Sequence, residues 1–540
     1  MAGGMEFDHI IVGGGSAGCV VAHRLVHAGR SVLLLEAGPG DAHAFVRTPA
    51  TFVRVIGTHR SFVYESEPEA GAAGRKLFIP QGRMLGGGSS LNAMVYVRGQ
   101  PQDYDDWAAQ GCIGWAWSDV LPVFRRAEAN ERLSGPLHGT DGPLTVSDAR
   151  HRHPLSLAFV RAAQEAGHPY NHDFNGAAQA GVGFYQTTTI DGRRGSTAQT
   201  YLRAVRGHRN LEVVTGATAT RVDIADRRAR GVTFQRADGT AQRASARASV
   251  ILTAGALATP KLLMLSGVGP ADHLSEIGIA AIVDSPGVGA NFQDHLEVGV
   301  YGRTRAAMSM LGHDRGWRAL RHGAEYALFR SGLLASTVVE SGGFFDTTGA
   351  GRPDVQFHVL PVLVGDVERA PFEGHGISLN PCYLRPKARG RVTLRSADPS
   401  TPIHLTTNAL SERDDVDTLI RGVRLARRIL RQPSLARLIE RELAPGESKE
   451  IDDDALEAHV RNHAKTVYHP AGTCRMSGDA HAPLDPQLAV RGVEGLFVGD
   501  ASAMPTLISG NTNAPVIMIA ERCADFVLAH SPAASAIDRT

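Results

Sequence analysis

The sequence predicts an α/β protein with two parts: a Rossmann-like nucleotide-binding domain that is discontinuous in sequence, and a second domain built on a mostly antiparallel sheet. Three observations lead to this prediction. A glycine-rich motif follows the first apolar run near the N-terminus, and another short strand that leads into a carboxylate lies near the C-terminus. Between them, beyond Val300, apolar and polar residues alternate at period two, as in antiparallel strands.

The N-terminal motif spans residues 7–38, FDHIIVGGGSAGCVVAHRLVHAGRSVLLLEAG. An apolar run, Ile10 to Val12, breaks at Gly13, and apolar residues resume at helical spacing after Gly18, so the expected order is strand, turn, helix. We expect Gly13 to allow a tight turn, Gly15 to let a pyrophosphate approach the backbone, and Gly18 to permit close helix packing. The alternative is a glycine-rich turn in another kind of α/β domain.

The helix that begins near Ser16 offers free backbone amides and a positive dipole end to an anionic diphosphate. A second strand, Val32 to Leu35, ends in Glu36, close to the spacing of about 20 residues expected for a carboxylate that binds a ribose hydroxyl. The motif therefore predicts a bound dinucleotide. By itself it does not distinguish NAD from FAD.

Length and composition limit the remaining possibilities. The chain has 540 residues, more than the single-core limit of about 250 to 300, so at least two structural units are expected. Its hydrophobic content of 43% and charged content of 21% are typical of a soluble globular protein. A formal charge of +1 gives no overall field for nucleic acid or an anionic membrane, so neither is expected as a partner.

Cysteine usage and the N-terminus indicate the compartment. Five scattered cysteines without CxxC spacing argue against a disulfide framework or a metal site. Only MAGGME precedes the first strand, without a signal-peptide pattern, and no apolar run reaches about 18 residues. We therefore expect a cytoplasmic chain without a transmembrane segment.

A second glycine-rich segment, FIPQGRMLGGGSSLNAMVYVRG, spans residues 78–99. Gly86 to Gly88 would let the backbone lie flat against a planar ligand, and Asn92 opens an apolar run from Ala93 to Val97. A flat flavin ring would suit this segment. The alternative is a mobile surface loop, against which the flanking apolar residues argue.

The middle of the chain supplies further strands and helices. Residues 211–235 predict a strand and a hairpin, and residues 249–256, SVILTAGA, predict a buried strand before a helix that closes at Gly267. PDVQFHVLPVL and ARGRVTLRSADPSTPIHL predict half-exposed antiparallel strands. Residues 414–431 predict a helix with arginines on its solvent face and Pro433 near its end.

A loop over residues 283–296 carries Asp294 and His295, either of which could be catalytic by residue type. A lone acid and a lone histidine in a loop more often satisfy backbone groups. We therefore interpret both as structural.

Two C-terminal stretches carry the reactive groups: AKTVYHPAGTCRM at residues 464–476 and GLFVGDASAMPTLISGNTNAPVIMI at residues 495–519. The strand Leu496 to Val498 leads to Asp500, a carboxylate able to bond the hydroxyls of a ribityl chain, which FAD has and NAD lacks. Pro515 suits the first turn of a helix. Its N-terminus would face the ring and stabilise negative charge there by roughly 0.3 to 2 kcal/mol.

His469 precedes Pro470, which disfavours helix and would project the imidazole from a loop. A neutral imidazole, with an unperturbed pKa of about 6.5, can accept the hydroxyl proton of an alcohol while the carbon-bound hydrogen leaves as hydride. Asn513 could hold the substrate oxygen beside it. Taken alone, a His-Pro pair is more often structural.

Together these motifs resemble the glucose-methanol-choline (GMC) oxidoreductases, in their alcohol and choline dehydrogenase branch, over nearly the whole chain. The resemblance rests on the N-terminal fingerprint with Glu36 and on GRMLGGGSSLN at 82–92, GALATPKLLMLSGVG at 255–269, YHPAGTCRM at 468–476 and GDASAMPTLISGNTNAP at 499–515. It implies an FAD-binding domain formed by residues 1–150, 195–300 and 455–535. The substrate-binding domain would then comprise residues 151–194 and 301–454.

The resemblance also implies a reaction and its residues. The reaction is FAD-dependent oxidation of an alcohol to an aldehyde or ketone, with His469 as the base, Asn513 as the second catalytic residue, and hydride transfer to flavin N5. Asn92 would lie near that nitrogen and Ala219 at the adenine. The implied FAD contacts are Gly13, Gly15, Ser16, Ala17, Gly18, Glu36, Ala37, Arg83, Gly88, Ser89, Asn92, Ala93, Val95, Ala219, Asp500, Ala501, Asn511 and Thr512.

Several alternatives stay open within the resemblance. Members with covalent FAD use a histidine in the glycine-rich segment, and residues 82–92 contain none, so non-covalent FAD is expected. Glu340 resembles an acid that binds the cationic head in choline-converting members, which keeps choline dehydrogenase as an alternative. Others are a cyanohydrin-cleaving lyase with structural FAD and a non-catalytic FAD-binding protein. Oxygen, a quinone or another carrier could accept the electrons, so an oxidase and a dehydrogenase are both consistent.

Overall fold

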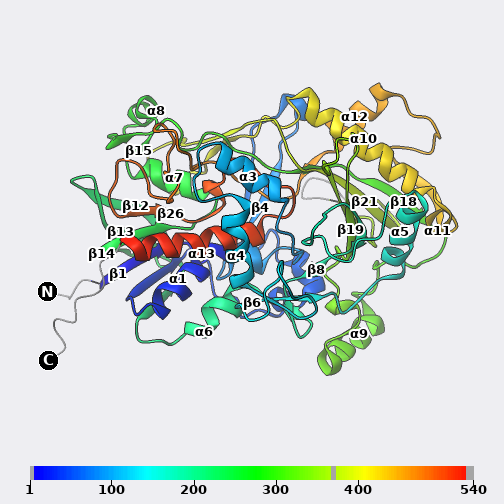
Figure 1. Ribbon diagram of the computed structural model, residues 1–540, viewed down its shortest axis with the longest axis horizontal. Helices are drawn as coiled ribbons and strands as arrows, with labels where there is room; N and C mark the ends of the chain where they lie inside the picture. The colour runs from blue at the N-terminus through cyan, green and yellow to red at the C-terminus, as the bar shows by residue number, and fades with distance from the viewer. Residues whose placement is uncertain (1–4, 366–371, 531–540) are drawn as a thin grey trace.

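The computed structural model describes residues 5–365 and 372–530 and contains two large sheets, one at each end of the long axis (Figure 1). The first has the strand order β11-β2-β1-β14-β13-β12, with β26 paired to β14. Its strands are β1 (Met5–Val12), β2 (Val32–Glu36), β11 (Leu211–Thr215), β12 (Ala217–Ala225), β13 (Arg228–Arg236), β14 (Ala241–Leu252) and β26 (Leu496–Val498).

The centre of this sheet is parallel, since β1 pairs in parallel with β2 and β14, β2 with β11, and β14 with β26. β12 and β13 extend it as the predicted antiparallel hairpin. Val12 is in register with both Leu35 and Leu252, and Leu252 with Val498. The carboxyl ends of four strands therefore meet at one edge, where open α/β sheets bind their ligands.

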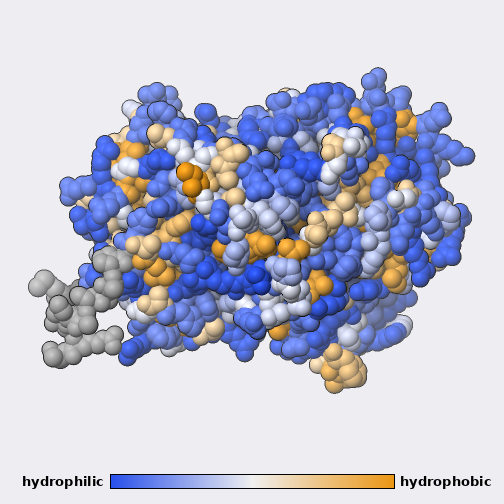
Figure 2. Space-filling model, in the orientation of Figure 1, coloured by the Kyte–Doolittle hydropathy of each residue, from blue (hydrophilic) through white to orange (hydrophobic). Residues whose placement is uncertain are grey.

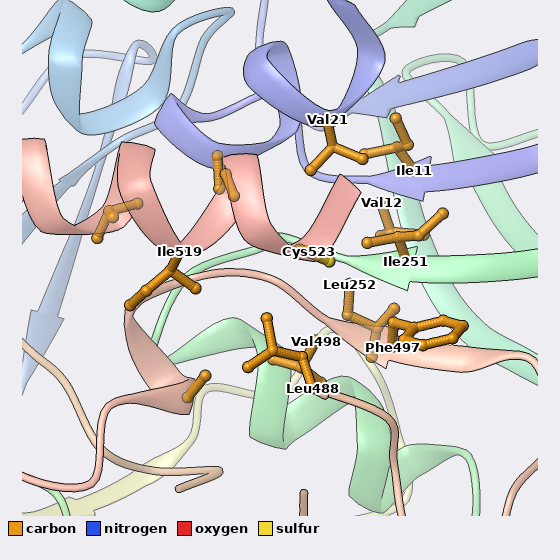
Figure 3. Packing of buried hydrophobic residues seen from close by; sticks show 14 of the residues in the cluster. Ile11, Val12, Val21, Ile251, Leu252, Leu488, Phe497, Val498, Ile519 and Cys523 are labelled. Carbon is orange, nitrogen blue, oxygen red and sulfur yellow. The ribbon is translucent and has the colours of Figure 1, made fainter. Parts of the chain in front are cut away.

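Two helices from opposite ends of the chain pack together against this sheet, α1 (Ser16–His27) and α13 (Asn513–His530) (Figure 1). Side chains of both helices meet those of β1, β14 and β26 in one apolar cluster (Figure 3). Each fully buried Val, Leu or Ile contributes about 1.5–3 kcal/mol. This packing fixes the N-termini of both helices at the ligand edge of the sheet.

The second sheet has the order β24-β18-β21-β20-β19-β7, with β17 and β25 attached, and its pairs are antiparallel as expected. Its strands are β7 (Gly181–Phe184), β17 (Leu296–Glu297), β18 (Val300–Thr304), β19 (Ser341–Phe345), β20 (Val355–Leu360), β21 (Gly376–Tyr383), β24 (Ile439–Ala444) and β25 (Lys465–Thr466). Helices α5 (Pro154–Glu165) and α10 (Arg413–Leu430) pack against it.

Two expectations about this half were wrong in detail. Strand β20 was expected to be half exposed, yet Val355 to Val359 are buried, because the strand is central in the sheet and helices cover it. Arg427 of α10 was expected on the solvent face but is buried, where its guanidinium donates to Glu442 at 2.7 Å.

The division into two domains stays a prediction. The segments expected to form the FAD-binding domain supply all seven strands of the first sheet, but β17 and β25, which lie in the same segments, join the second. No helix within residues 5–365 or 372–530 is long and apolar enough to cross a membrane.

Candidate active site

A glycine cradle lies at the carboxyl edge of the parallel strands. Gly13 has a φ of +105°, and a Cβ there would lie 2.5 Å from the Thr253 carbonyl oxygen. A Cβ on Gly18 would lie 1.9 Å from the Gly13 oxygen, whereas one on Gly15 would meet nothing closer than 3.8 Å. The geometry thus confirms a tight turn at Gly13, close packing at Gly18, and an open approach to the backbone at Gly15.

Ser16 joins three segments that are far apart in sequence. Its hydroxyl accepts a hydrogen bond from the Ser89 backbone amide at 3.1 Å and donates one to Asn513 Oδ1 at 2.9 Å. A Cβ on Gly87 would lie 2.7 Å from the Gly15 Cα, so the second glycine-rich segment packs directly on the first. The start of α13, the start of α1 and the glycine cluster therefore form one continuous wall.

Glu36 is buried at the end of β2, where its carboxylate accepts hydrogen bonds from the amides of Gly14 at 2.9 Å and Gly38 at 2.8 Å. Burial raises the pKa of Glu36, although those two amides lower it. Each carboxylate oxygen keeps acceptor capacity for a ligand hydroxyl. The expected ribose contact is compatible with this arrangement.

Asp500 was expected to bind ligand hydroxyls, but the structure gives its carboxylate other partners. One oxygen accepts from the Gly255 amide at 2.8 Å and the Thr259 hydroxyl at 2.6 Å. The other accepts from the amide and hydroxyl of Ser502 at 2.9 and 2.6 Å. Four donors use all of its acceptor sites, so Asp500 ties β26 to the loop after β14.

A cavity of about 1370 Å³ begins at this cradle and continues to the second sheet. It exceeds the roughly 300–1,000 Å³ of sites for drug-sized ligands, so it has room for a dinucleotide and a substrate. The predicted residues that line it are Gly13, Gly15, Ser16, Ala17, Glu36, Ala37, Arg83, Gly88, Asn92, Ala93, Val95, Ala219, His469, Asp500, Ala501, Asn511, Thr512 and Asn513. Gly18 and Ser89 do not line it and support the wall from behind.

His469 lines the cavity, and Asn511 is its polar neighbour. Asn511 Nδ2 is 3.4 Å from His469 Nε2, and Asn511 Oδ1 accepts a hydrogen bond from the Gln356 amide at 2.9 Å. Because Gln356 Nε2 can only donate, the amide group of Asn511 is oriented with its nitrogen toward His469. The donor nitrogen of Asn511 therefore lies beside His469 Nε2 at the cavity wall.

The expected partner of His469 was Asn513, and this expectation was wrong. Asn513 is the first residue of α13, and its Oδ1 accepts the hydroxyl of Ser16 at 2.9 Å. It is thus bound to the glycine cradle. Asn511, two residues before the helix begins, takes the position beside the imidazole.

His295, interpreted from the sequence as structural, fixes the tautomer of His469. Its Nε2 lies 2.9 Å from the Leu384 carbonyl oxygen and its Nδ1 lies 3.0 Å from His469 Nδ1. Since a carbonyl only accepts, the proton of neutral His295 is on Nε2, and its Nδ1 must accept from His469. His469 therefore carries its proton on Nδ1 and presents an unprotonated Nε2 to the cavity.

Both rings are held neutral. Burial lowers the pKa of His469 well below its usual value, and the neighbouring His295 and His358 lower it further. Burial also lowers the pKa of His295 to about 4. The unprotonated Nε2 is consequently the resting state at neutral pH.

Asp294, the other residue of that loop, fixes the backbone of His469. Its carboxyl accepts the His469 amide at 2.8 Å and the Thr466 hydroxyl. Burial raises the pKa of Asp294 to about 7, although these hydrogen bonds lower it. Tyr468, with a φ of +68°, makes the turn that this contact holds. Asp294 thus positions the backbone of His469, and His295 positions its imidazole.

The comparisons with known proteins agree with this geometry. The N-terminal GMC oxidoreductase family model matches residues 7–297, and the C-terminal one matches residues 386–520. The chain is 43% identical to an alcohol dehydrogenase [acceptor] from Pseudomonas putida, over 97% of this chain and 96% of that protein. It is 40% identical to the mitochondrial choline dehydrogenase of Homo sapiens, over 97% and 90% of the two chains.

Solved structures show the same fold. Pyridoxine 4-oxidase from Mesorbium loti aligns with a TM-score of 0.87 and 31% identity, over 96% of this chain and 98% of that one. The chain belongs to the GMC oxidoreductase family. The α/β fold with a mostly antiparallel second sheet is therefore the family fold, as the resemblance implied.

At the end of the cavity that reaches the second sheet, this GMC oxidoreductase has an acid, Glu297, which the sequence interpretation missed. Lys465 is its register partner across β17 and β25, and their charged groups lie 3.1 Å apart. His358 Nδ1 lies 2.9 Å from the second carboxylate oxygen, and Asn380 donates to the first at 3.0 Å. No local pattern in the sequence signals this pair, since β17 and β25 have two residues each.

The charges of this cluster balance. Burial lowers the pKa of Lys465, but Glu297 outweighs it and the net shift is upward. Burial raises the pKa of Glu297, but Lys465 and His358 hold the net value below normal. An ammonium and a carboxylate therefore face the same part of the cavity with no net charge between them.

Glu340, which resembles an acid that binds the cationic head in choline-converting members, lies elsewhere. It is fully buried and accepts hydrogen bonds from His151 at 2.6 Å, from the His153 amide at 2.6 Å, and from Ser156 and Ser336 at 2.9 and 2.6 Å. It is absent from the cavity wall. Glu340 therefore joins the start of α5 to the strand β19 and does not line the described cavity.

FAD, the cofactor implied by the resemblance, fits the observed cradle. Side chains are excluded from Gly13 and Gly87, which leaves bare backbone at the start of α1. Behind this wall, buried Arg194 donates to Asn92 Oδ1 at 2.8 Å, to the Ser89 oxygen at 3.1 Å and to the Val46 oxygen at 2.9 Å, and so fixes Asn92 at the cavity. The chemistry of the wall therefore suits an anionic diphosphate and a planar ring.

Proposed function

We propose that this oxidoreductase binds FAD non-covalently and oxidises an uncharged alcohol to the aldehyde or ketone. One observation carries the proposal: His469 Nε2 and Asn511 Nδ2, 3.4 Å apart, converge on the cavity that begins at the nucleotide cradle. The alcohol dehydrogenase among the relatives is consistent with it. Anaerobic reduction of the protein-bound flavin by an alcohol tests it.

The residues of this chain handle the hydroxyl group. The alcohol hydroxyl donates its hydrogen bond to His469 Nε2, which then accepts the proton, while Asn511 Nδ2 donates to the oxygen on which negative charge develops. His295 and Asp294 keep the imidazole in the correct tautomer and orientation. Bound FAD supplies the hydride acceptor.

Non-covalent FAD gives a direct prediction. His358 and His469 are the histidines that line the cavity in the described part of the chain, and both have assigned partners there. We expect denaturation followed by filtration to release all yellow colour into the filtrate. Flavin fluorescence that stays with the polypeptide after denaturing gel electrophoresis would contradict the expectation.

The pH profile follows from the environment of His469. Its pKa lies well below 6.5, so kcat/KM should stay constant as pH falls from 7.5 through 6.5, where an ordinary histidine base would be half protonated. Asp294 titrates near pH 7, but its Oδ1 accepts the His469 amide in either state.

The measurement is kcat/KM between pH 5 and 8, with FAD retention followed by absorbance at each pH. An acid limb centred at pH 6.5, with FAD still bound, would show that the imidazole in the cavity is not held neutral.

The substrate class follows from the Glu297 and Lys465 pair. A cationic alcohol such as choline would meet an ammonium beside the only acid at that end of the described cavity wall. Because Lys465 already neutralises Glu297, the pair offers no net attraction to offset the cost of taking a cationic head out of water, so a neutral alcohol is favoured. The apolar neighbours Val339, Leu360 and Val364 suit a neutral chain.

We expect the wild type to prefer 3,3-dimethylbutan-1-ol, the uncharged isostere of choline, by about tenfold or more in kcat/KM, because an unpaired charge is costly to bury. Lys465→Met should shift the preference toward choline at least tenfold, because it leaves Glu297 without its cationic partner. The matched control is Lys465→Met with Glu297→Gln, which removes both charges and should show no shift. Choline preferred by the wild type, or equal shifts in both variants, would contradict the assignment.

A further inference from the structure

Helix α9 (Gly316–Phe329) presents its apolar side chains to solvent. Trp317 is 66% exposed, Leu320 77%, Leu328 74% and Phe329 69%. Tyr326 is the one buried residue of the helix, and its hydroxyl donates to the Gly192 oxygen at 3.0 Å. In Figure 1 the helix protrudes from the body of the molecule, and in Figure 2 the same tip is coloured as hydrophobic.

The apolar residues form a stripe. Trp317, Leu320, Ala324 and Leu328 recur at the three- and four-residue intervals that place side chains on one face of a helix. Tyr326 points to roughly the opposite face, at 100° per residue. The usual arrangement is therefore reversed, since the face that a globular protein would bury is the one directed outward.

The charges beside the stripe are mainly positive. Arg318 and Arg321 lie along one side of it, and neither pairs with a carboxylate among residues 5–365 and 372–530. Glu325, on the same side, lies 3.8 Å from His322. Arg315 precedes the helix and Arg330 ends it. Asp314, the nearest acid before the helix, binds Arg54 at 2.9 Å and lies 4.0 Å from Arg315.

We propose that α9 is a docking helix that lies in the surface of an anionic lipid bilayer. An apolar stripe with arginines along one side, on a helix that stands out from the body, is the arrangement that binds the interface between headgroups and acyl chains. The net charge of +1 gave no reason to expect such a partner, because it averages over the whole chain and hides this local group.

Charge favours lipid over a second copy of the chain. A symmetric contact through this stripe would bring Arg318 and Arg321 of both copies into one interface, which concentrates positive charge there and is unfavourable. Anionic headgroups neutralise them instead. Lipid docking through α9 does not depend on the proposed oxidation of an alcohol.

The position of α9 links the lipid surface to the cavity. The helix packs on the short turn η5 (Leu333–Ala335), which in turn packs on η1 (Pro49–Arg54). Phe52 and Val53 of η1 line the cavity, and Val53 is 54% exposed. Docking through α9 would therefore bring this wall of the cavity near the bilayer.

The experiment is flotation of the full-length holoprotein with vesicles of phosphatidylcholine containing 30% phosphatidylglycerol, and with phosphatidylcholine alone. We expect binding to the anionic vesicles that weakens with salt. Trp317 is the exposed member of the four tryptophans, so its fluorescence should shift to the blue on binding, and Trp317→Phe should abolish the shift.

Two variants test the two parts of the patch. Leu320→Glu with Leu328→Glu should reduce binding to anionic vesicles at least tenfold. Arg318→Gln with Arg321→Gln should reduce binding to anionic vesicles and leave binding to neutral vesicles unchanged. Ile113→Glu is the matched control, since Ile113 is 85% exposed in a different loop, and it should bind like the wild type.

Three outcomes would overturn the proposal. The first is no wild-type flotation at low salt. The second is an equal loss in the Ile113→Glu control. The third is a dimer in size-exclusion chromatography that the leucine variants dissociate while no vesicle binding is observed, which would assign the stripe to a second copy.

Discussion

Replacing His469 with alanine is expected to lower kcat/KM for an alcohol by on the order of 10² to 10⁴, because the acceptor of the hydroxyl proton is removed. The loss should appear in kcat as well, since the proton is accepted in the transition state. The measurement is the rate of flavin reduction by a saturating alcohol in a stopped-flow instrument without oxygen.

The control is the flavin absorbance of the variant, which should match the wild type because His469 does not belong to the glycine cradle. His295→Gln is a useful companion, since a glutamine oxygen can still accept the His469 Nδ1 proton. It should retain more activity than His295→Ala. A His469→Ala enzyme with an unchanged rate of flavin reduction would remove this residue from the role of base.

Asn511 and Asn513 should respond very differently to the same substitution. Asn511→Ala removes the donor 3.4 Å from His469 Nε2 and is expected to lower kcat by about 10² to 10³, the usual cost of losing one oxyanion donor. Asn513→Ala removes only the contact to Ser16 and is expected to weaken FAD retention with a less than tenfold effect on kcat.

The comparison is made on FAD-saturated proteins with the same alcohol, so that loss of cofactor does not imitate loss of catalysis. A larger loss of kcat in Asn513→Ala than in Asn511→Ala would restore the interpretation made from the sequence. It would also show that the hydrogen bond between Ser16 and Asn513 breaks in the substrate complex.

Much of the nucleotide-binding half was predictable, because its signals are local. Glycine spacing, a strand before it and a carboxylate after it are constraints on the backbone of one βαβ unit. The tight turn at Gly13 and the close packing at Gly18 are as predicted, and the pyrophosphate contact at Gly15 stays a prediction. The parallel strands, the hairpin and the start of the last helix near Pro515 are confirmed for the same reason.

Side-chain direction in the C-terminal loop was not predictable from the residues around it. Asn511 and Asn513 are of the same type and two apart, and the choice between them depends on where α13 begins. The helix starts at Asn513, so this side chain reaches Ser16, and only Asn511 is free to approach His469.

Glu297 was missed because its role depends on its pairing with Lys465, which lies in a distant segment of the sequence. Glu297 and Lys465 become register partners only when β17 pairs with β25, a pairing of two very short strands that periodicity cannot detect. Glu340, which drew attention through a likeness in sequence, lies buried beside the start of α5.

The most direct test of the central claim is to mix the purified yellow holoprotein with a panel of uncharged primary and secondary alcohols under strict exclusion of oxygen. We predict that at least one alcohol bleaches the flavin absorbance stoichiometrically and forms one aldehyde or ketone per flavin. Persistence of the yellow colour with every alcohol, FAD and fold being intact, would contradict the account, and release of an aldehyde from a cyanohydrin without bleaching would identify a lyase.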